Sequence, residues 1–157
     1  MFSTATLQTS DIEELHQTVV RSRDHLEELG WLAQATLDQF SLHYEAILAM
    51  SALHISVIRI DGCVAGAVEL QDHGHYHVIG YWLGVDYRGS GLATRAVQQV
   101  LDQYPGTIRA DTLRRNPASA RVLERLAFVL THSDSERCYY ERASVQTIDI
   151  PDAILAK

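Results

Sequence analysis

The sequence predicts a mixed α/β fold in one domain, with a sheet that is mostly antiparallel. Its 157 residues are enough to bury one substantial core, and 46% hydrophobic residues with three prolines are ordinary for a globular protein. The β-branched run 54–60 and the run 63–70 flank Asp61-Gly62, a strong hairpin signal. A glycine-rich loop at 88–91 then leads from a strand into a helix, which indicates one βαβ-like crossing.

The elements before this hairpin are predicted to be one strand and two helices. Residues 3–9 read as a short strand. A helix is predicted from Asp11 to Gly30, because Asp11 and Glu14 have the capping-box arrangement and apolar residues recur at helical spacing. A second helix is predicted from Leu32 to Met50.

The second half of the chain alternates strands and helices. A third meander strand is expected at 75–85, and the helix after the glycine loop should stop near Pro105. Asn116 followed by Pro117 predicts the start of another helix, with Asn116 as its N-cap. The remaining elements are a strand at 107–113, the body of that helix to 128, and a final hairpin of 128–132 and 137–143.

Composition and charge narrow the class of partner. The formal net charge of −7 argues against a nucleic-acid binder and fits a cationic partner such as an amine. The apolar runs are too short to cross a bilayer, and the first residues lack the pattern of a secretory signal. Cys63 and Cys138 have no metal-binding spacing, so we expect reduced thiols and a cytoplasmic location.

The loop Arg88-Gly89-Ser90-Gly91 has the character of a phosphate-binding turn. N–H groups at a helix N-terminus attract phosphate oxygens, and glycines let a ligand approach the backbone. A P-loop is excluded because Leu92-Ala93 stands where Lys-Ser or Lys-Thr is required. A dinucleotide-binding fold is excluded because the loop reads G-S-G-L-A-T and follows antiparallel strands.

Two segments resemble a known family. Arg88-x-x-Gly91-x-Ala93 resembles the pyrophosphate-binding motif of the GNAT superfamily of acyl-CoA-dependent N-acetyltransferases. "GYWLGVDYRGSGLA" and "NPASARVLERLAF" resemble its RimJ/RimL branch, with Ala127-Phe128 where the family usually has Gly-Phe. The resemblance implies a central splayed strand pair, helices on both faces of the sheet, and one acetyltransferase domain over residues 1–144. The tail 145–157 has no assigned role.

The resemblance also implies the cofactor site. The amides from Arg88 to Ala93 would bind the pyrophosphate of acetyl-CoA, and the pantetheine arm would lie along residues 78–85. Asn116 matches an asparagine that contacts the cofactor, and Ser119 a serine near its sulfur. The expected cofactor-binding residues are Leu83, Gly84, Val85, Arg88, Gly89, Ser90, Gly91, Leu92, Ala93, Asn116 and Ser119.

Acetyl transfer to an amine needs a base for the amine proton and a proton donor for the departing thiolate. Ser119 is the expected thiol-side donor; Leu123 stands where many GNAT enzymes have a tyrosine, so Tyr140 or Tyr139 is expected to substitute. Glu69 is the expected base, because burial in an apolar strand would raise its pKa; the alternative is that it faces solvent.

Three alternating histidines, His73, His75 and His77, would point to one side of an extended strand. His75 or His77 acting as base through water is a further alternative. No metal is expected, since the superfamily does not normally need one.

The sequence therefore predicts an acetyl-CoA-dependent N-acetyltransferase that acts on a primary amine. A protein or peptide N-terminus is the favoured acceptor, and a small cationic amine such as a polyamine or aminoglycoside is the competitor. A non-catalytic acyl-CoA-binding sensor is the alternative from another class. No nucleic-acid or membrane partner is expected, and a homodimer is expected by analogy with such enzymes.

Overall fold

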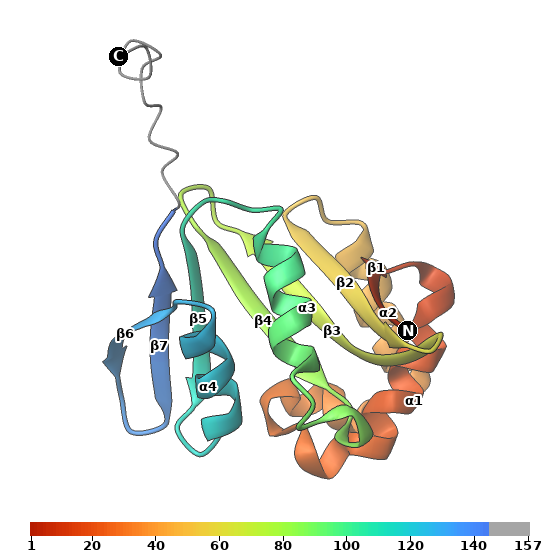
Figure 1. Ribbon diagram of the computed structural model, residues 1–157. Coiled ribbons are helices and arrows are strands. Elements are labelled where there is room, and N and C mark those ends of the chain that lie inside the picture. The colour runs from red at the N-terminus through yellow and green to blue at the C-terminus, as the bar shows by residue number, and fades with distance from the viewer. Residues whose placement is uncertain (145–157) are drawn as a thin grey trace, which may run out of the picture.

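A computed structural model describes residues 1–144 and shows one seven-stranded sheet with helices on both faces (Figure 1). The strand order is β1-β2-β3-β4-β5-β7-β6, and all neighbours are antiparallel except β4 and β5. The strands are β1 (Phe2–Thr6), β2 (Leu53–Ile60), β3 (Cys63–Asp72), β4 (His77–Leu83), β5 (Ile108–Leu113), β6 (Val129–Ser133) and β7 (Arg137–Arg142). The predicted mixed fold with a mostly antiparallel sheet is confirmed. The tail that was expected at 145–157 lies outside the described residues.

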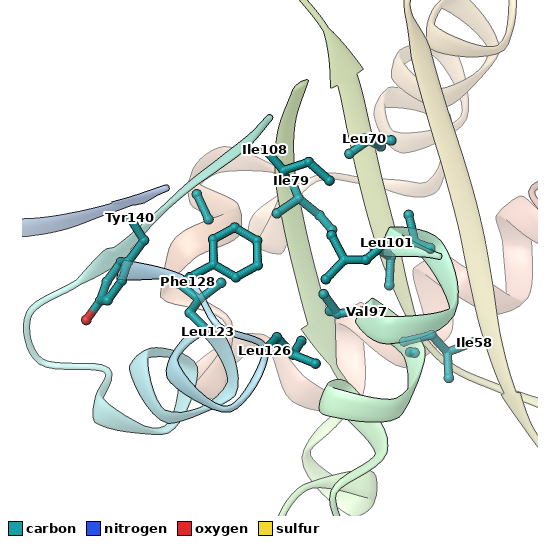
Figure 2. Close-up of a cluster of buried hydrophobic side chains, with 14 of the residues drawn as sticks. Ile58, Leu70, Ile79, Val97, Leu101, Ile108, Leu123, Leu126, Phe128 and Tyr140 are labelled. Carbon is teal, nitrogen blue, oxygen red and sulfur yellow. The ribbon is translucent and has the colours of Figure 1, made fainter. Parts of the chain in front are cut away.

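Two cores hold the helices against opposite faces of the sheet. α3 (Leu92–Leu101) and α4 (Pro117–Arg125) cover one face, and Figure 2 shows their core, with Val97 and Leu101 facing Ile79 and Ile108. α1 (Ile12–Ser22) and α2 (Leu37–Leu48) cover the other face around Phe40 and Tyr44. The strands contribute side chains to both cores, because successive side chains along a strand point to opposite faces of the sheet.

The β2–β3 hairpin forms as its turn residues predict. Asp61 has φ 50° and Gly62 has φ 85°, so both central residues lie in the left-handed region that an Asp-Gly hairpin turn uses. Asn116 also caps α4 as predicted, because its side chain accepts a hydrogen bond from the amide of Ser119.

The N-terminal helices are shorter than predicted. α1 ends at Ser22, eight residues before Gly30, and short 3₁₀ turns at Arg23–His25 and Glu27–Gln34 follow it. α2 begins at Leu37, because Thr36 and Gln39 form a reciprocal capping box there. The residues between the two helices are therefore free to border the cleft described below.

The predicted capping pair Asp11 and Glu14 was wrong. Neither side chain caps α1. Both carboxylates instead bind Arg59 of β2, at 2.6 Å for Asp11 and 3.3 Å for Glu14, and Glu14 also accepts the amide of Val64. An arginine 48 residues away in the chain therefore outcompetes the local cap and fixes α1 against the sheet.

Candidate active site

The two parallel strands at the centre of the sheet separate along their length. β4 and β5 pair only at His77 with Ile108 and at Val78 with Arg109, and they diverge towards Leu83 and Leu113. A cleft of about 600 Å³ lies between the separated ends, within the range of small-molecule sites. The N-terminus of α3, helix α4 and the turn Glu27–Gln34 border this cleft.

The glycine loop presents a helix N-terminus to the cleft. Gly89 has φ 83° and Gly91 has φ 76°, a backbone conformation that side chains with a Cβ adopt at a cost. Gly91 is the N-cap of α3, and no side chain caps the helix. Because the first-turn N–H groups have no capping side chain, they can bind an anion. The loop was predicted to follow the strand directly. Instead, a single turn at Val85–Tyr87 separates the loop from β4.

Most of the expected cofactor-binding residues line this one cleft, namely Leu83, Arg88, Gly89, Gly91, Leu92, Ala93, Asn116 and Ser119. Gly84, Val85 and Ser90 do not line it. Their polar groups are used within the protein: Gly84 donates to the carbonyl of Ala65 at 2.7 Å, Val85 donates to Ser22 Oγ at 2.9 Å, and Ser90 Oγ donates to the carbonyl of Tyr87 at 3.4 Å.

Arg88 and Asn116 tie the cofactor side of the cleft to the turns after α1. The Arg88 guanidinium donates to the carbonyl of His25, and the Asn116 amide donates to the carboxylate of Glu28. The other end of the Asn116 amide accepts the N–H of Ser119 at 3.2 Å. One asparagine therefore both begins α4 and joins it to the opposite wall.

Two arginines of α4 give the cleft a positive rim. Arg121 and Arg125 line it one helical turn apart, and among residues 1–144 neither takes part in a salt bridge. Exposed guanidinium groups of this kind suit phosphate oxygens. Neither arginine was among the expected site residues, although their i, i+4 spacing is readable in the sequence.

Ser119 has a partner that the sequence did not suggest. The hydroxyl of Tyr81 lies 2.9 Å from Ser119 Oγ and 3.0 Å from the Ser119 carbonyl oxygen. Burial raises the pKa of Tyr81 to about 12, so this hydroxyl stays protonated at neutral pH. Tyr81 was not among the expected site residues, because 38 residues separate it from Ser119 and no local pattern links the two.

Tyr140 lies elsewhere. It belongs to β7, is 5% exposed, and stands at one end of the core that Figure 2 shows, beside Leu123 and Phe128. Tyr140 is not among the residues that line the cleft. Leu123, at the position where a tyrosine was sought, is fully buried in the same core.

Glu69 reaches the cleft from the face of the sheet that α1 and α2 cover. The Tyr44 hydroxyl donates to Glu69 Oε1 at 3.4 Å, and Tyr44 belongs to the core on that face. Burial raises the pKa of the Glu69 carboxyl above its ordinary value, and the hydrogen bond from Tyr44 opposes this in part. Glu69 therefore stands on one face of β4, while the Ser119–Tyr81 pair stands on the other.

The other carboxylates near the cleft already have partners. Glu27 accepts from Arg115 at 2.9 Å, which lowers the pKa of Glu27. Glu28 is bound by Asn116, and Asp111 pairs with Arg137. Glu69 is thus the lining carboxylate whose hydrogen-bond partner is a neutral tyrosine from the core.

His73, His75 and His77 were predicted to point to one side of a strand, and this prediction was wrong. β3 ends at Asp72 and β4 begins at His77, so a turn separates His73 from His77. His73 stacks on Tyr76 in this turn, and none of the three lines the cleft. Residues 1–144 contain no group of three or more His, Cys, Asp or Glu placed to hold a metal ion.

Comparison with known proteins decides the family. A family model, the acetyltransferase (GNAT) domain, matches residues 5–129. The chain belongs to this GNAT family. It is accordingly an acetyl-CoA-dependent N-acetyltransferase with acetyl-CoA as its co-substrate. No curated protein sequence matches the chain.

Solved structures share the GNAT fold at low sequence identity. One is the RimL ribosomal L7/L12 α-N-protein acetyltransferase in complex with coenzyme A, at 19% identity and TM-score 0.83 over 91% of this chain and 94% of that one. Another is the spermidine N-acetyltransferase from Vibrio cholerae with coenzyme A and spermine, at 15% identity and TM-score 0.77 over 91% and 95%. A third is the microcin C7 self-immunity acetyltransferase with acetyl-CoA and AMP, at 19% identity and TM-score 0.77 over 89% and 92%.

The cleft of this GNAT enzyme contains groups that would suit acetyl-CoA. The uncapped N-terminus of α3 and the arginines of α4 suit its phosphates. Thr94 and Thr112 also line the cleft, and their buried hydroxyls have no hydrogen-bond partner among the described residues.

Proposed function

We propose that this enzyme acetylates the N-terminal α-amine of a protein or peptide, with Glu69 as the base. The observation that carries the proposal is one partly buried carboxylate in a cleft whose other carboxylates are paired. When bound, acetyl-CoA supplies a thioester carbonyl that an amine can attack, and the residues of the chain handle the protons.

One buried carboxylate with a raised pKa favours an acceptor with one charged amine at the site. The other lining carboxylates, Glu28 and Asp111, already accept hydrogen bonds from Asn116 and Arg137, so they are less available to the further ammonium groups of a polyamine. An α-amine also has a pKa near 8, against about 10.4 for a lysine-type amine, so a carboxylate takes its proton at a smaller cost.

A further feature of the cleft favours a peptide. Leu29 and Leu53, both partly exposed, give it an apolar wall that a side chain can contact.

Protons move on both faces of β4 in this mechanism. As the amine nitrogen forms its bond to the acetyl carbon, Glu69 takes the amine proton. As the carbon–sulfur bond breaks, Ser119 gives a proton to the sulfur, and the Tyr81 hydroxyl 2.9 Å away replaces it. The products are the acetylated amine and the free thiol, and Glu69 and Tyr81 recover their starting states by exchange with solvent.

Several wider expectations stay predictions. We propose residues 1–144 as one catalytic domain, a cytoplasmic location in keeping with the free Cys63 and Cys138, and a homodimer. Within residues 1–144, no helix has both the length and the apolar character to cross a membrane.

A direct test compares acceptors at fixed acetyl-CoA. Thiol release is measured with a panel of short peptides with free N-termini, the same peptides blocked at the N-terminus, spermidine and an aminoglycoside. The proposal expects turnover with free peptides, none with blocked ones, and a higher kcat/KM for the best peptide than for either small amine. A higher kcat/KM for spermidine than for every peptide would contradict the proposal and identify a polyamine as the better substrate.

A further inference from the structure

Gly80 stands in the middle of β4 for no reason that packing or backbone geometry supplies. A side chain at this position would find open space, because a Cβ built on Gly80 meets no heavy atom within 4 Å. Its φ is not positive, so the conformation does not require glycine. Glycine weakens a strand interior, which makes its presence between Ile79 and Tyr81 costly.

The other strand glycine behaves differently. A Cβ on Gly66 of β3 would lie 2.1 Å from the carbonyl oxygen of Trp82, so the close approach of β3 and β4 requires glycine there. Gly66 thus has a structural explanation, and Gly80 has none inside the protein. The two glycines belong to the same strand pair, but Gly66 is buried where β3 and β4 approach closely, whereas Gly80 is exposed.

Gly80 faces Glu69 directly across the strand pair. The two residues are register partners, so a side chain at position 80 would stand on the same face as the Glu69 carboxylate and about 5 Å from its Cβ. Tyr44 of α2 donates a hydrogen bond to Glu69, and both Gly80 and Glu69 line the cleft. The missing side chain therefore leaves one side of the Glu69 carboxylate open to the cleft.

We infer that the space over Gly80 is the passage by which the acceptor amine reaches Glu69, and that position 80 sets how bulky the carbon next to this amine can be. The inference rests on the proposed function, in which Glu69 is the base. It predicts that small amines pass with any small residue at position 80, and that a branched carbon next to the amine passes only over glycine.

The test uses two variants and a matched control. Gly80→Val fills the passage, and valine is favoured in strands, so the fold should persist. Gly80→Ala narrows it by one methyl group. Gly106→Val is the control, because Gly106 also has open space and no positive φ but lies outside the cleft, in the loop before β5. Acetyl-CoA affinity is measured by titration, and kcat/KM with methylamine and with the best peptide.

Gly80→Val is expected to lose at least 100-fold in kcat/KM for the peptide while its acetyl-CoA affinity stays within about threefold of the parent. Gly80→Ala should lose more with the peptide than with methylamine, and Gly106→Val should match the parent. The inference is overturned by a Gly80→Val enzyme with parental peptide kinetics, or by equal losses for both acceptors in Gly80→Ala. It is also overturned if acetyl-CoA affinity falls in step with turnover.

Failure of the proposed base would look different. Glu69→Gln with parental kinetics would remove Glu69 as the base, whereas a selective loss in Gly80→Ala would still identify the passage. If Gly80→Val does not fold, Gly80→Ala alone decides, because its prediction is a ratio between two acceptors in one protein sample.

Discussion

The two sides of the cleft differ in what they offer a ligand. On the side proposed for the cofactor, the backbone is available: Gly89 and Gly91 adopt positive φ, and no side chain caps the first turn of α3. On the side proposed for the acceptor, single side chains are available, and Glu69 and the residues around it come from β2, β3, β4 and the turn Glu27–Gln34. The backbone groups come from one short stretch of sequence, whereas the side chains come from stretches that are far apart in the sequence.

The largest effect should come from removing the carboxylate on the acceptor side. Glu69→Gln keeps the shape of the residue and removes the proposed base, so kcat/KM for the acceptor should fall about 10²- to 10⁴-fold. Acetyl-CoA affinity, measured by titration, should stay unchanged because the cofactor side is untouched. A parallel loss of affinity would erase the distinction between the two sides.

The same variant sharpens the comparison through its pH dependence. The pKa of Glu69 is raised in the folded protein, so the acid limb of kcat/KM should lie above the ordinary carboxyl range and disappear in Glu69→Gln. A raised carboxyl pKa means that the folded state binds the proton more tightly, so stability falls as pH rises through that pKa. Glu69→Gln should therefore raise Tm at pH 8 and leave it nearly unchanged at pH 4; equal shifts at both would contradict this.

A smaller effect is expected where the thiolate is protonated. Tyr81→Phe and Ser119→Ala should each lower kcat about 10- to 100-fold, because each breaks the pair that the 2.9 Å contact joins. The double variant should lose much less than the product of the two single losses, since the hydroxyls act in series. Independent, multiplicative losses would show that the two hydroxyls do not form one path.

The arginines of the cofactor side should contribute less again. Arg121→Ala with Arg125→Ala should weaken acetyl-CoA binding about 10-fold, and the loss should shrink in high salt because exposed charges are screened. Arg114→Ala is the matched control, since Arg114 binds the carbonyl of Asp134 outside the cleft. Isothermal titration at two salt concentrations measures both variants; equal losses would deny the α4 rim a specific role.

The smallest effect lies outside the cleft and concerns stability alone. Ala127 follows Leu126, the C-cap of α4, and has φ 65°, a left-handed conformation that costs a residue with a Cβ about 1 kcal/mol and glycine little. Ala127→Gly should therefore raise Tm by a few degrees and leave both acetyl-CoA affinity and turnover unchanged. A lower Tm would mean that the methyl group of Ala127 stabilises more than its backbone costs.

Local signals predicted the fold well, and distant contacts explain what they missed. The Asp61-Gly62 turn, the Asn116 cap and the glycine loop are each encoded by neighbouring residues, and all three occur. α1 was extended too far because Leu26 continues its apolar spacing, yet Leu26 is buried from a turn. The Thr36–Gln39 capping box was readable and overlooked.

In the candidate site too, residues close together in the sequence were predicted and contacts between distant residues were not. The loop residues that border the cleft lie within six positions of one another, and the sequence identified them together. The Tyr81–Ser119 contact joins a strand to a helix across 38 residues, and Tyr44 meets Glu69 across 25, so no local pattern announces either. Periodicity can give the face on which a residue stands, and only the packing of helices gives its partner.

An open sheet normally has two edge strands. Because β4 and β5 separate, this sheet also has two unpaired strand edges in its middle. Beyond Val78 and Arg109, neither strand has the other as a ladder partner. Unpaired strand edges invite pairing with another chain, and proteins usually cover or shorten them. Here the two inner edges face each other across the cleft, and acetyl-CoA bound in it would cover them. Amide hydrogen exchange along Ile79–Leu83 should therefore slow when the cofactor binds, and the empty enzyme should be the form more prone to aggregate.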